Sequence, residues 1–360
     1  MTAPILIMAG GTGGHVFPAL AVARALKGCD QQIVWLGSRR GIENELVPRE
    51  GFPLEATRVS GLRGKGIWSW CVAPLKLLLA IYDALRVVIR HRPKLVLGMG
   101  GFASGPGGLA AWMLGKPVII HEQNSVAGLT NRLLAGFARE VLEAFPGSFS
   151  SGIGARLVGN PVREAITALA EPSVRLAGRE GPVRVLVLGG SQGARVLNER
   201  VPVAVSLLGD DQQCEVWHQS GRNDFAQTRD TYKSAGLDVR VEAFIDDVAE
   251  CYAWADLVIC RAGALTISEL TAAGLGAILV PYPSAVDDHQ TKNAGYLVAA
   301  GAAVLIPQSE LTAELLAGEL RRCCENRALV IDRAASARKL ARPDATRDVV
   351  DLCLSMVQAS

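Results

Sequence analysis

Three glycine-rich segments of this sequence have the spacing of anion-binding turns. They are residues 9–15 (AGGTGGH), 98–108 (GMGGFASGPGG) and 189–195 (GGSQGAR), and each follows an apolar run and precedes a helix-like stretch. At such a turn the first N–H groups of the helix are unpaired and the helix dipole is positive, so the turn can bind phosphate. Glycine lets the backbone approach the phosphate oxygens closely. One such loop could be only a tight turn, but three favour phosphate binding.

Two side chains beside these loops are candidate general bases. His15 closes the first loop at a helix start, where the positive helix dipole disfavours an imidazolium ion. We therefore expect a neutral ring at pH 7 that accepts a proton, although a structural histidine or a donor to phosphate fits the same position. Glu122, in the segment HEQN, is the rival base. It could instead orient His121 or cap the helix after Ser125. Asn124 and Ser125 are themselves good N-cap residues, so a capping role is an alternative for them too.

In the second half, a carboxylate lies near the start of a further helix. The segment CRAGALTISEL, residues 260–270, begins at the last residue of the apolar run DLVIC and contains Glu269. The pattern Thr266-x-x-Glu269 matches a capping box, and an acidic residue near a helix start suits the dipole. The functional alternative is a carboxylate that accepts hydrogen bonds from both hydroxyls of a ribose. Taken alone, the pattern favours the cap.

The loops depart from two common nucleotide-binding patterns. In the first loop, Val16 stands where G-x-G-x-x-G requires its third glycine, and the second strand ends in WLGSRRG without an acidic residue for a ribose 2′-hydroxyl. Arg39 and Arg40 could instead bind the 2′-phosphate of NADP, so an NADP-dependent oxidoreductase remains an alternative. No loop is followed by a Walker lysine, which excludes ATP hydrolysis by a P-loop.

Length and composition limit the class of protein. At 360 residues the chain is long enough for two domains, and 49% hydrophobic with 20% charged residues indicates a globular protein. A net charge of +2 argues against general nucleic-acid binding. The 8 cysteines form no C-x-x-C pair, so we expect buried thiols in a reducing compartment and no metal site. The N-terminus lacks the basic segment of a signal peptide.

Short apolar runs alternate with helix-length segments, and the alternation restarts after residue 180. The runs are near-continuous in Val, Ile and Leu, as in strands of a parallel sheet covered on both faces. LIMAGGTGG near residue 10 and VLVLGGSQG near residue 189 form an internal repeat. The predicted fold class is α/β, with two doubly wound parallel-sheet domains joined between VGNPVREA and AGREGPVR. Helices are expected at 16–28, 41–50, 105–115, 125–137, 194–208, 222–235, 246–254, 264–274 and 288–300.

The most hydrophobic region is residues 67–92, IWSWCVAPLKLLLAIYDALRVVIRHR. Charged residues interrupt it, so it lacks the apolar length that a membrane-spanning helix needs. Aromatic and leucine side chains among basic ones suit an amphipathic helix that lies on anionic lipid, with an ordinary core-facing helix as the alternative. The candidate membrane patch comprises Trp68, Leu75, Lys76, Leu79, Tyr82, Arg86 and Trp112.

Several longer motifs occur in a fixed order: GGTGGHVFPALAVA, VSGLRGKG, GMGGFASGPGG, HEQNSVAGLTNRLL, GNPVR, GGSQGA and RAGALTISEL. Together they resemble the MurG family of glycosyltransferases, from residue 5 to about residue 350. The resemblance implies a GT-B architecture, in which two Rossmann-like domains face each other across the active-site cleft. Residues 1–163 and a C-terminal helix at 342–360 would form the acceptor- and membrane-facing domain, and residues 164–341 the donor-binding domain.

The reaction that the resemblance implies moves N-acetylglucosamine from UDP-N-acetylglucosamine to the muramyl 4-hydroxyl of lipid I. The products would be lipid II, for peptidoglycan synthesis, and UDP, with inversion at the transferred sugar. No D-x-D motif is present, so neither a metal at the diphosphate nor a cofactor is expected. The implied location is peripheral, on anionic lipid at the cytoplasmic face of the inner membrane, with cell-wall assembly proteins as further partners. A non-catalytic protein that binds nucleotide sugars is the third alternative.

The resemblance also assigns site residues by position. Glu269 would hold the ribose hydroxyls, and Ile245 would pair with uracil through its backbone. Gln290, or its neighbour His289, would bind the sugar hydroxyls, and His15 or Glu122 would take the acceptor proton. The other donor contacts would be Thr12, Gly13, Gly14, Asn124, Arg163, Ser191, Ala264, Leu265, Thr266, Ile267 and Ser268, with Arg163 and Ser191 at the diphosphate. The acceptor pyrophosphate would lie across Gly10, Gly11, Gly13, Gly14, Gly100, Gly101, Ser104 and Gly105.

Overall fold

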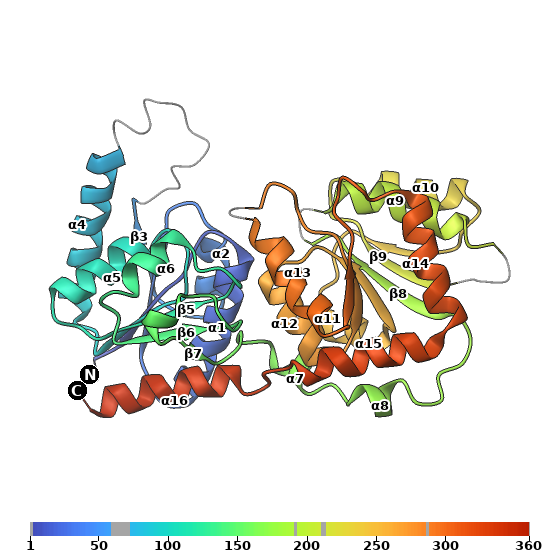
Figure 1. The fold of residues 1–360 in the computed structure, drawn as a ribbon. Coiled ribbons are helices and arrows are strands. Elements are labelled where there is room, and N and C mark those ends of the chain that lie inside the picture. Colours follow the sequence, from blue (N-terminus) through green and yellow to red (C-terminus); the bar gives the residue numbers. More distant parts are fainter. Residues whose placement is uncertain (1–2, 59–72, 191–192, 210–213, 286–287, 360) are drawn as a thin grey trace. The chain divides into compact units, whose positions relative to one another are not determined.

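The protein folds into two compact units. The first comprises Met1–Val162 and Pro343–Ser360, and the second Arg163–Arg342. Each unit is a parallel sheet with helices packed against it (Figure 1), so the predicted α/β class with two doubly wound sheets is confirmed. The computed structural model describes residues 3–58, 73–190, 193–209, 214–285 and 288–359.

The first unit contains a seven-stranded sheet in the order β3-β2-β1-β4-β5-β6-β7, and every pair of neighbours is parallel. Strands β1 and β4 are wholly buried, as a sheet with helices on both faces requires. The strands are β1 (Ile5–Met8), β2 (Ile33–Ser38), β3 (Leu54–Thr57), β4 (Leu95–Gly98), β5 (Val118–Glu122), β6 (Glu140–Glu143) and β7 (Arg156–Leu157). The helices are α1 (Gly13–Gly28), α2 (Glu43–Arg49), α4 (Ala73–His91), α5 (Ser104–Met113), α6 (Leu129–Leu134), α16 (Ala345–Gln358) and a 3-10 turn at Ser151–Ile153.

Each face of this sheet has its own apolar core, because successive side chains of a strand point to opposite faces. Ile7 packs on the side of α1 and α16, whereas Leu6 packs on the side of α4 and α5. Val349 and Cys353 of α16 lie in the same core as Ile7. The last helix of the chain is therefore part of the first unit.

The second unit contains a six-stranded parallel sheet in the order β10-β9-β8-β11-β12-β13. Its apolar core joins strands β8, β11 and β12 to helices that precede and follow them in the chain. The strands are β8 (Val183–Leu188), β9 (Cys214–Gln219), β10 (Arg240–Glu242), β11 (Leu257–Cys260), β12 (Gly276–Leu279) and β13 (Ala303–Leu305). The helices are α7 (Glu164–Thr167), α8 (Pro172–Arg175), α9 (Arg195–Ser206), α10 (Phe225–Ser234), α11 (Val248–Trp254), α12 (Ala264–Ala273), α13 (His289–Ala299), α14 (Ala313–Glu325) and α15 (Arg327–Lys339).

Both sheets have a topological switch point, where the strand order reverses. It lies between β1 and β4 in the first unit and between β8 and β11 in the second. Open parallel sheets bind ligands at this point, beyond the carboxyl ends of the strands. The loops that leave it are residues 9–12 and 99–103 in the first unit, and 189–190, 193–194 and 261–263 in the described part of the second. The glycine segments of the sequence therefore lie where each sheet is expected to bind its ligand.

Candidate functional site

The two glycine loops of the first unit touch each other. Gly100 and Gly101 have φ of +87° and +82°, in the left-handed region that glycine adopts without strain. A β-carbon at Gly101 would overlap the backbone of Gly10, and one at Gly100 would overlap the imidazole ring of His15. The loops after β1 and β4 therefore form one continuous surface, with His15 against it.

The first turn of α1 is open to a ligand. Thr12 is the N-cap residue, with an extended backbone at φ −122°, and its side chain accepts no capping hydrogen bond. Gly13 and Gly14 follow it, and the N–H groups of a first helical turn have no partner within the helix. Thr12 and Gly14 are exposed. These residues are placed where an anion can meet the positive end of the helix.

A buried carboxylate that the sequence analysis missed holds the first loop. Glu43, the first residue of α2, is fully buried, and its Oε2 accepts the N–H of Gly11 at 2.9 Å. Its Oε1 accepts the N–H and the hydroxyl of Ser38 at 2.9 and 2.7 Å. The Gly11 amide, which we expected at the acceptor pyrophosphate, is instead bonded within the protein. In the sequence Glu43 is only an acidic residue shortly after Arg40, and no motif predicted its hydrogen bond to Gly11.

Ser104 also differs from expectation. Its hydroxyl is fully buried and lies 3.0 Å from the carbonyl oxygen of Met8 and 2.8 Å from that of Gly100. Its N–H donates to the carbonyl oxygen of Gly101 at 3.3 Å. Both donors of Ser104 therefore tie the second glycine loop to itself and to β1, and neither faces a pyrophosphate. Gly105, the next residue of α5, remains partly exposed.

His15 lies at one end of a chain of polar side chains. Its Nδ1 is 2.8 Å from Oε1 of Gln123, and Nε2 of Gln123 is 3.0 Å from Nδ1 of His121. Nε2 of His121 is 2.8 Å from the carbonyl oxygen of Gly159. His121 and Gln123 are buried, and burial lowers the pKa of His121, so this ring is neutral. Gln123, which the sequence analysis did not single out, connects the two rings.

Glu122, the rival base, is buried and makes its hydrogen bonds within its own loop. Its Oε1 accepts the N–H and the side-chain amide of Asn124 at 2.9 and 3.1 Å. Its Oε2 accepts the N–H of Gly128 at 3.0 Å and the side-chain amide of Asn131 at 2.8 Å. Four donors occupy the lone pairs of a carboxylate. These contacts support the structural alternative for Glu122, in which it shapes the turn between β5 and α6.

In the second unit, α12 begins directly at the switch point. Gly263 is its N-cap residue and Ala264 its first residue, so Thr266 lies inside the helix and the capping box suggested by the sequence does not form. The N–H groups of the first turn, which includes Ala264 and Leu265, have no partner within the helix and can bind an anion. Leu265 and Thr266 are partly exposed.

Two predicted contacts with the sugar donor, Ile267 and Ser268, also make hydrogen bonds within α12. The side chain of Ile267 is fully buried, and its N–H donates to the carbonyl oxygen of Gly263 at 2.9 Å. The hydroxyl of Ser268 donates to the carbonyl oxygen of Ala264 at 3.1 Å. The side chain of Ile267 therefore belongs to the core, and the hydroxyl hydrogen of Ser268 is used within the helix.

Glu269 lies in the middle of α12, too far from its N-terminus to cap the helix. Its carboxylate is buried, and its Oε2 accepts the hydroxyl of Tyr252 at 3.1 Å. Its Oε1 lies 3.7 Å from the guanidinium of Arg163. Burial raises the pKa of Glu269, and the charge of Arg163 and the hydrogen bond from Tyr252 oppose that shift. The structure thus brings Arg163 and Glu269 together, and it adds Tyr252, which carried no motif in the sequence.

The third glycine loop packs closely against the end of β9. Gly193 has φ +77°, and a β-carbon there would overlap the carbonyl oxygen of Ser220. The N–H of Ile245 lies 3.4 Å from Oε1 of Gln219, a long and weak hydrogen bond. Ser191 lies outside the described residues.

Gln290 is oriented by the backbone. It lies in the first turn of α13, and its Oε1 accepts the N–H of Tyr282 at 2.8 Å. Its amide nitrogen is therefore the end that can donate to a sugar hydroxyl. Across the described ranges, no cluster of three or more His, Cys, Asp or Glu side chains has the arrangement of a metal site.

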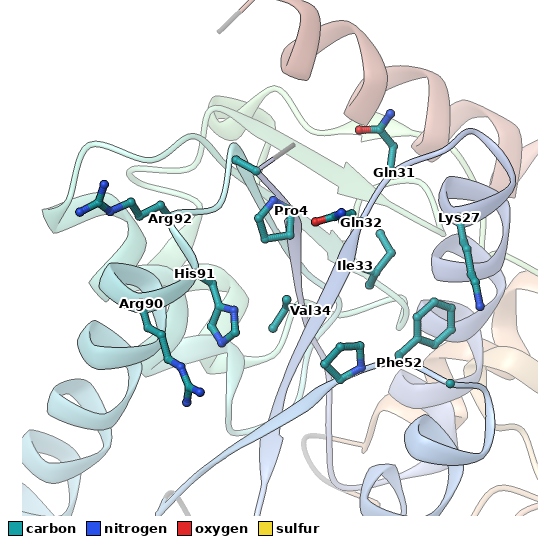
Figure 2. A pocket seen from close by; sticks show the side chains of 13 residues that line it. Pro4, Lys27, Gln31, Gln32, Ile33, Val34, Phe52, Arg90, His91 and Arg92 are labelled. Carbon is teal, nitrogen blue, oxygen red and sulfur yellow. The ribbon is translucent and has the colours of Figure 1, made fainter. Parts of the chain in front are cut away.

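A pocket of about 650 Å³ lies at the other end of the first sheet (Figure 2). Pro4 and Ile33 line it at the amino ends of β1 and β2, and Lys27 and His91 line it at the carboxyl ends of α1 and α4. Figure 2 shows Lys27 and His91 on opposite sides of the apolar strand residues. Since parallel sheets bind ligands at the carboxyl ends of their strands, this pocket is remote from the candidate site.

Helix α4 has one face in the core and another in solvent. Ala84 and Val88 belong to the core cluster on that side of the sheet. Leu75 and Tyr82 are 60% and 55% exposed, and Trp112 of the neighbouring α5 is 53% exposed. The remaining described members of the predicted membrane patch, Lys76, Leu79 and Arg86, are exposed, and Trp68 lies outside the described residues. Among the helices that the structure describes, none has the length and apolarity to cross a membrane.

Comparisons with known proteins match the whole chain. Residues 5–143 match the glycosyltransferase family 28 N-terminal domain, and residues 184–349 match the glycosyltransferase family 28 C-terminal domain. A relative from Nitrosococcus oceani is 53% identical over 99% of both chains, and one from Alkalilimnicola ehrlichii is 54% identical over 98% of this chain and 99% of its own. Both are named UDP-N-acetylglucosamine–N-acetylmuramyl-(pentapeptide) pyrophosphoryl-undecaprenol N-acetylglucosamine transferase.

Solved structures agree with this assignment. The crystal structure of MurG from Acinetobacter baumannii is 41% identical, with a TM-score of 0.87 over 98% of this chain and 100% of that one. The glycosyltransferase of kitacinnamycin, at 18% identity and a TM-score of 0.73, shares the fold. The NADP-dependent oxidoreductase considered from Arg39 and Arg40 finds no support in these relatives. The chain belongs to glycosyltransferase family 28, among the N-acetylglucosamine transferases of the MurG type.

Proposed function

We propose that this protein transfers N-acetylglucosamine from UDP-N-acetylglucosamine to the muramyl 4-hydroxyl of lipid I, giving lipid II and UDP. The names of relatives that match over almost the whole chain support this substrate pair. The observation that carries the proposal is the buried carboxylate of Glu269 beside the switch point of the second unit. It accepts one hydrogen bond, from Tyr252, and lies 3.7 Å from Arg163. A buried carboxylate with free acceptor capacity suits the paired hydroxyls of a ribose.

The second unit binds the donor in this proposal. Glu269 accepts the ribose hydroxyls, and Arg163, 3.7 Å away, is close enough to meet the adjacent diphosphate. The first turn of α12 binds the phosphate at its N–H groups, which stabilise the charge that develops as UDP leaves. The backbone of Ile245 binds the uracil ring. Its N–H makes only a weak hydrogen bond to Gln219, which is easily replaced by one to uracil. Gln290 donates to the sugar hydroxyls.

The first unit binds the acceptor. The pyrophosphate of lipid I lies on the joined surface of the two glycine loops, at Gly10, Gly13, Gly14 and the pair Gly100 and Gly101. Gly14 is exposed and Gly13 and Gly101 are partly exposed, so the phosphate can reach the backbone at these three residues. The Gly11 amide and Ser104 do not contribute, since their donors are bonded within the protein.

The proposed chemical step is a single displacement at the anomeric carbon of N-acetylglucosamine. The bond from the acceptor O4 to C1 forms while the bond from C1 to the phosphate oxygen breaks, and UDP leaves with the electron pair. The 4-hydroxyl proton passes to His15, which lies against the glycine loops that hold the acceptor. Attack opposite the leaving group inverts the configuration at C1. No metal takes part in this step.

The protein works at a membrane surface in this proposal. Lipid I is anchored in lipid, and the exposed apolar side chains of α4 with Lys76 and Arg86 suit the surface of an anionic bilayer. We place the protein peripherally at the cytoplasmic face of the inner membrane, where cell-wall assembly proteins are its expected neighbours.

Transfer of labelled sugar from UDP-N-acetylglucosamine to a lipid I analogue, in the presence of EDTA, tests this function. We expect turnover by the wild type and a large increase in the KM for the donor in Glu269→Ala. Tight binding of UDP-N-acetylglucosamine without transfer would instead indicate the non-catalytic alternative. Unchanged donor binding in Glu269→Ala would remove the ribose role of Glu269.

A further inference from the structure

The hydrogen-bond chain behind His15 has only one consistent arrangement of protons. It starts at the carbonyl oxygen of Gly159, which can only accept a hydrogen bond. Nε2 of His121 lies 2.8 Å from that oxygen, so it must carry a hydrogen. His121 is fully buried and neutral, because burial lowers the pKa of His121, and its Nδ1 is therefore the unprotonated nitrogen.

Two acceptors on His121 then fix the amide of Gln123. Nε2 of Gln123 lies 3.0 Å from Nδ1 of His121 and 3.2 Å from the backbone carbonyl oxygen of the same residue. Both positions need a donor, and the amide nitrogen supplies its two hydrogens to them. The reversed amide would place an oxygen against these acceptors. The backbone is also held, since the side chain of Asn160 donates to the carbonyl oxygen of Gln123 at 3.0 Å.

The oxygen of this fixed amide faces His15. Oε1 of Gln123 lies 2.8 Å from Nδ1 of His15, so that nitrogen must carry a hydrogen in either charge state of the ring. Gly100 lies so close to the same nitrogen that a β-carbon there would overlap the ring. The bond to Gln123 and the close packing of Gly100 together leave one edge of His15 for proton exchange.

We infer that Gln123, oriented by His121, holds His15 in the Nδ1–H tautomer and leaves Nε2 as the only ring nitrogen that exchanges a proton with substrate. Gln123 and His121 are positioning residues, since they act through His15. Their importance for turnover rests on the proposed role of His15 as the base. The tautomer itself does not, and it can be observed without substrate.

The direct test is NMR of the full chain labelled with ¹⁵N-histidine, at a pH where His15 is neutral. The sequence contains only 5 histidines, and the His15→Gln variant identifies the signals of His15. We expect a protonated Nδ1 and an unprotonated Nε2 in the wild type. A predominant Nε2–H form, which free imidazole side chains prefer in water, would overturn the inference.

Two substitutions at Gln123 separate positioning from packing. Gln123→Met keeps the volume and removes the acceptor, and we expect a mixture of tautomers and a loss of kcat of about ten- to hundredfold at unchanged donor KM, less than the 10⁴ of a triad with the wrong tautomer. Gln123→Glu keeps an oxygen for Nδ1–H of His15 but places its second oxygen against the two acceptors on His121, so we expect the Nδ1–H tautomer of His15 together with a lower Tm than that of the wild type. Equal His15 tautomers in Gln123→Met and the wild type would contradict the inference.

The same experiment distinguishes failure of the inference from failure of the proposed function. If the Nδ1–H tautomer is present in the wild type and lost in Gln123→Met while kcat is unchanged, the inference about Gln123 stands and the assignment of His15 as the base is wrong. Binding of UDP-N-acetylglucosamine and the thermal unfolding curve of each variant verify that the protein is folded.

Discussion

At the scale of single residues, the number of hydrogen bonds that a buried carboxylate accepts indicates its role. Glu43 accepts three hydrogen bonds and Glu122 accepts four, all from the protein. Glu269 accepts one from Tyr252 and has a guanidinium 3.7 Å away. Because a carboxylate offers about four acceptor positions, Glu269 retains capacity for a ligand while the other two shape loops.

The buried charge of Glu269 is expected to lower the free energy of unfolding at neutral pH. Burial raises the pKa of Glu269 in the folded protein, so the stability that the protonated form provides at low pH is lost as the pH rises through the folded pKa. Glu269→Gln removes a buried charge of nearly the same shape. We expect a higher Tm than the wild type at pH 8 and a difference that shrinks toward pH 4, measured by calorimetry.

Donor binding should change in the opposite direction in the same variant. A charge-assisted hydrogen bond contributes about 1.5–3 kcal/mol, so the affinity of Glu269→Gln for UDP-N-acetylglucosamine should fall about ten- to hundredfold by isothermal titration. A variant that is less stable than the wild type at pH 8, or one that binds the donor normally, would contradict this account of Glu269.

Glu43 is expected to be a stability residue of the first loop. In Glu43→Gln an amide NH₂ replaces an oxygen that accepts a hydrogen bond in a buried position, and two donors then face each other. Such an unsatisfied contact costs about 1–3 kcal/mol, which thermal unfolding will detect. Glu45→Gln on the same helix is the matched control, since the Glu45 side chain is 67% exposed. Equal Tm changes in the two variants would show that the buried contacts of Glu43 do not stabilise the fold.

At the scale of elements, the sequence predicted where helices lie better than what their residues contact. The segments 105–115 and 264–274 correspond to α5 and α12, because strand runs, glycine turns and apolar periodicity are local features. The capping box at Thr266 was wrong, because Gly263 already begins the helix one turn earlier. Gln123 and Tyr252 could not be predicted, since their partners lie 108 and 17 residues away in the chain.

Helix α4 is the element whose exposed face should bind the membrane. Leu75 is 60% exposed on that face, so Leu75→Glu should leave the core intact and place a negative charge against anionic lipid. Withdrawing one leucine from lipid contact costs about 1.5–3 kcal/mol, so vesicle affinity should fall at least about tenfold in a sedimentation assay.

A matched control separates the patch from general effects of the substitution. Leu315, on α14 of the second unit, is 44% exposed, and Leu315→Glu makes the same chemical change elsewhere. Vesicle affinity of Leu315→Glu should equal that of the wild type. If the two variants bind anionic vesicles equally well, α4 is not the membrane-binding element.

At the scale of the whole molecule, one sheet topology occurs twice. The orders β3-β2-β1-β4-β5-β6 and β10-β9-β8-β11-β12-β13 place equivalent strands at each switch point, which explains the internal repeat near residues 10 and 189. The fold class and the position of the glycine loops followed from the sequence pattern. The substrates did not, because phosphate-binding turns are shared by many enzymes. They followed from motifs whose resemblance the relatives confirm.

The most direct test of the central claim is a single-turnover assay of sugar transfer to a lipid I analogue, by the wild type and by His15→Ala, with the product's anomeric configuration read by NMR. We predict a β-linked product from the wild type. In His15→Ala we predict a loss of about 10²–10⁴ in the rate of transfer, with the affinity for UDP-N-acetylglucosamine retained. An α-linked product, or transfer by His15→Ala at the wild-type rate, would contradict the account.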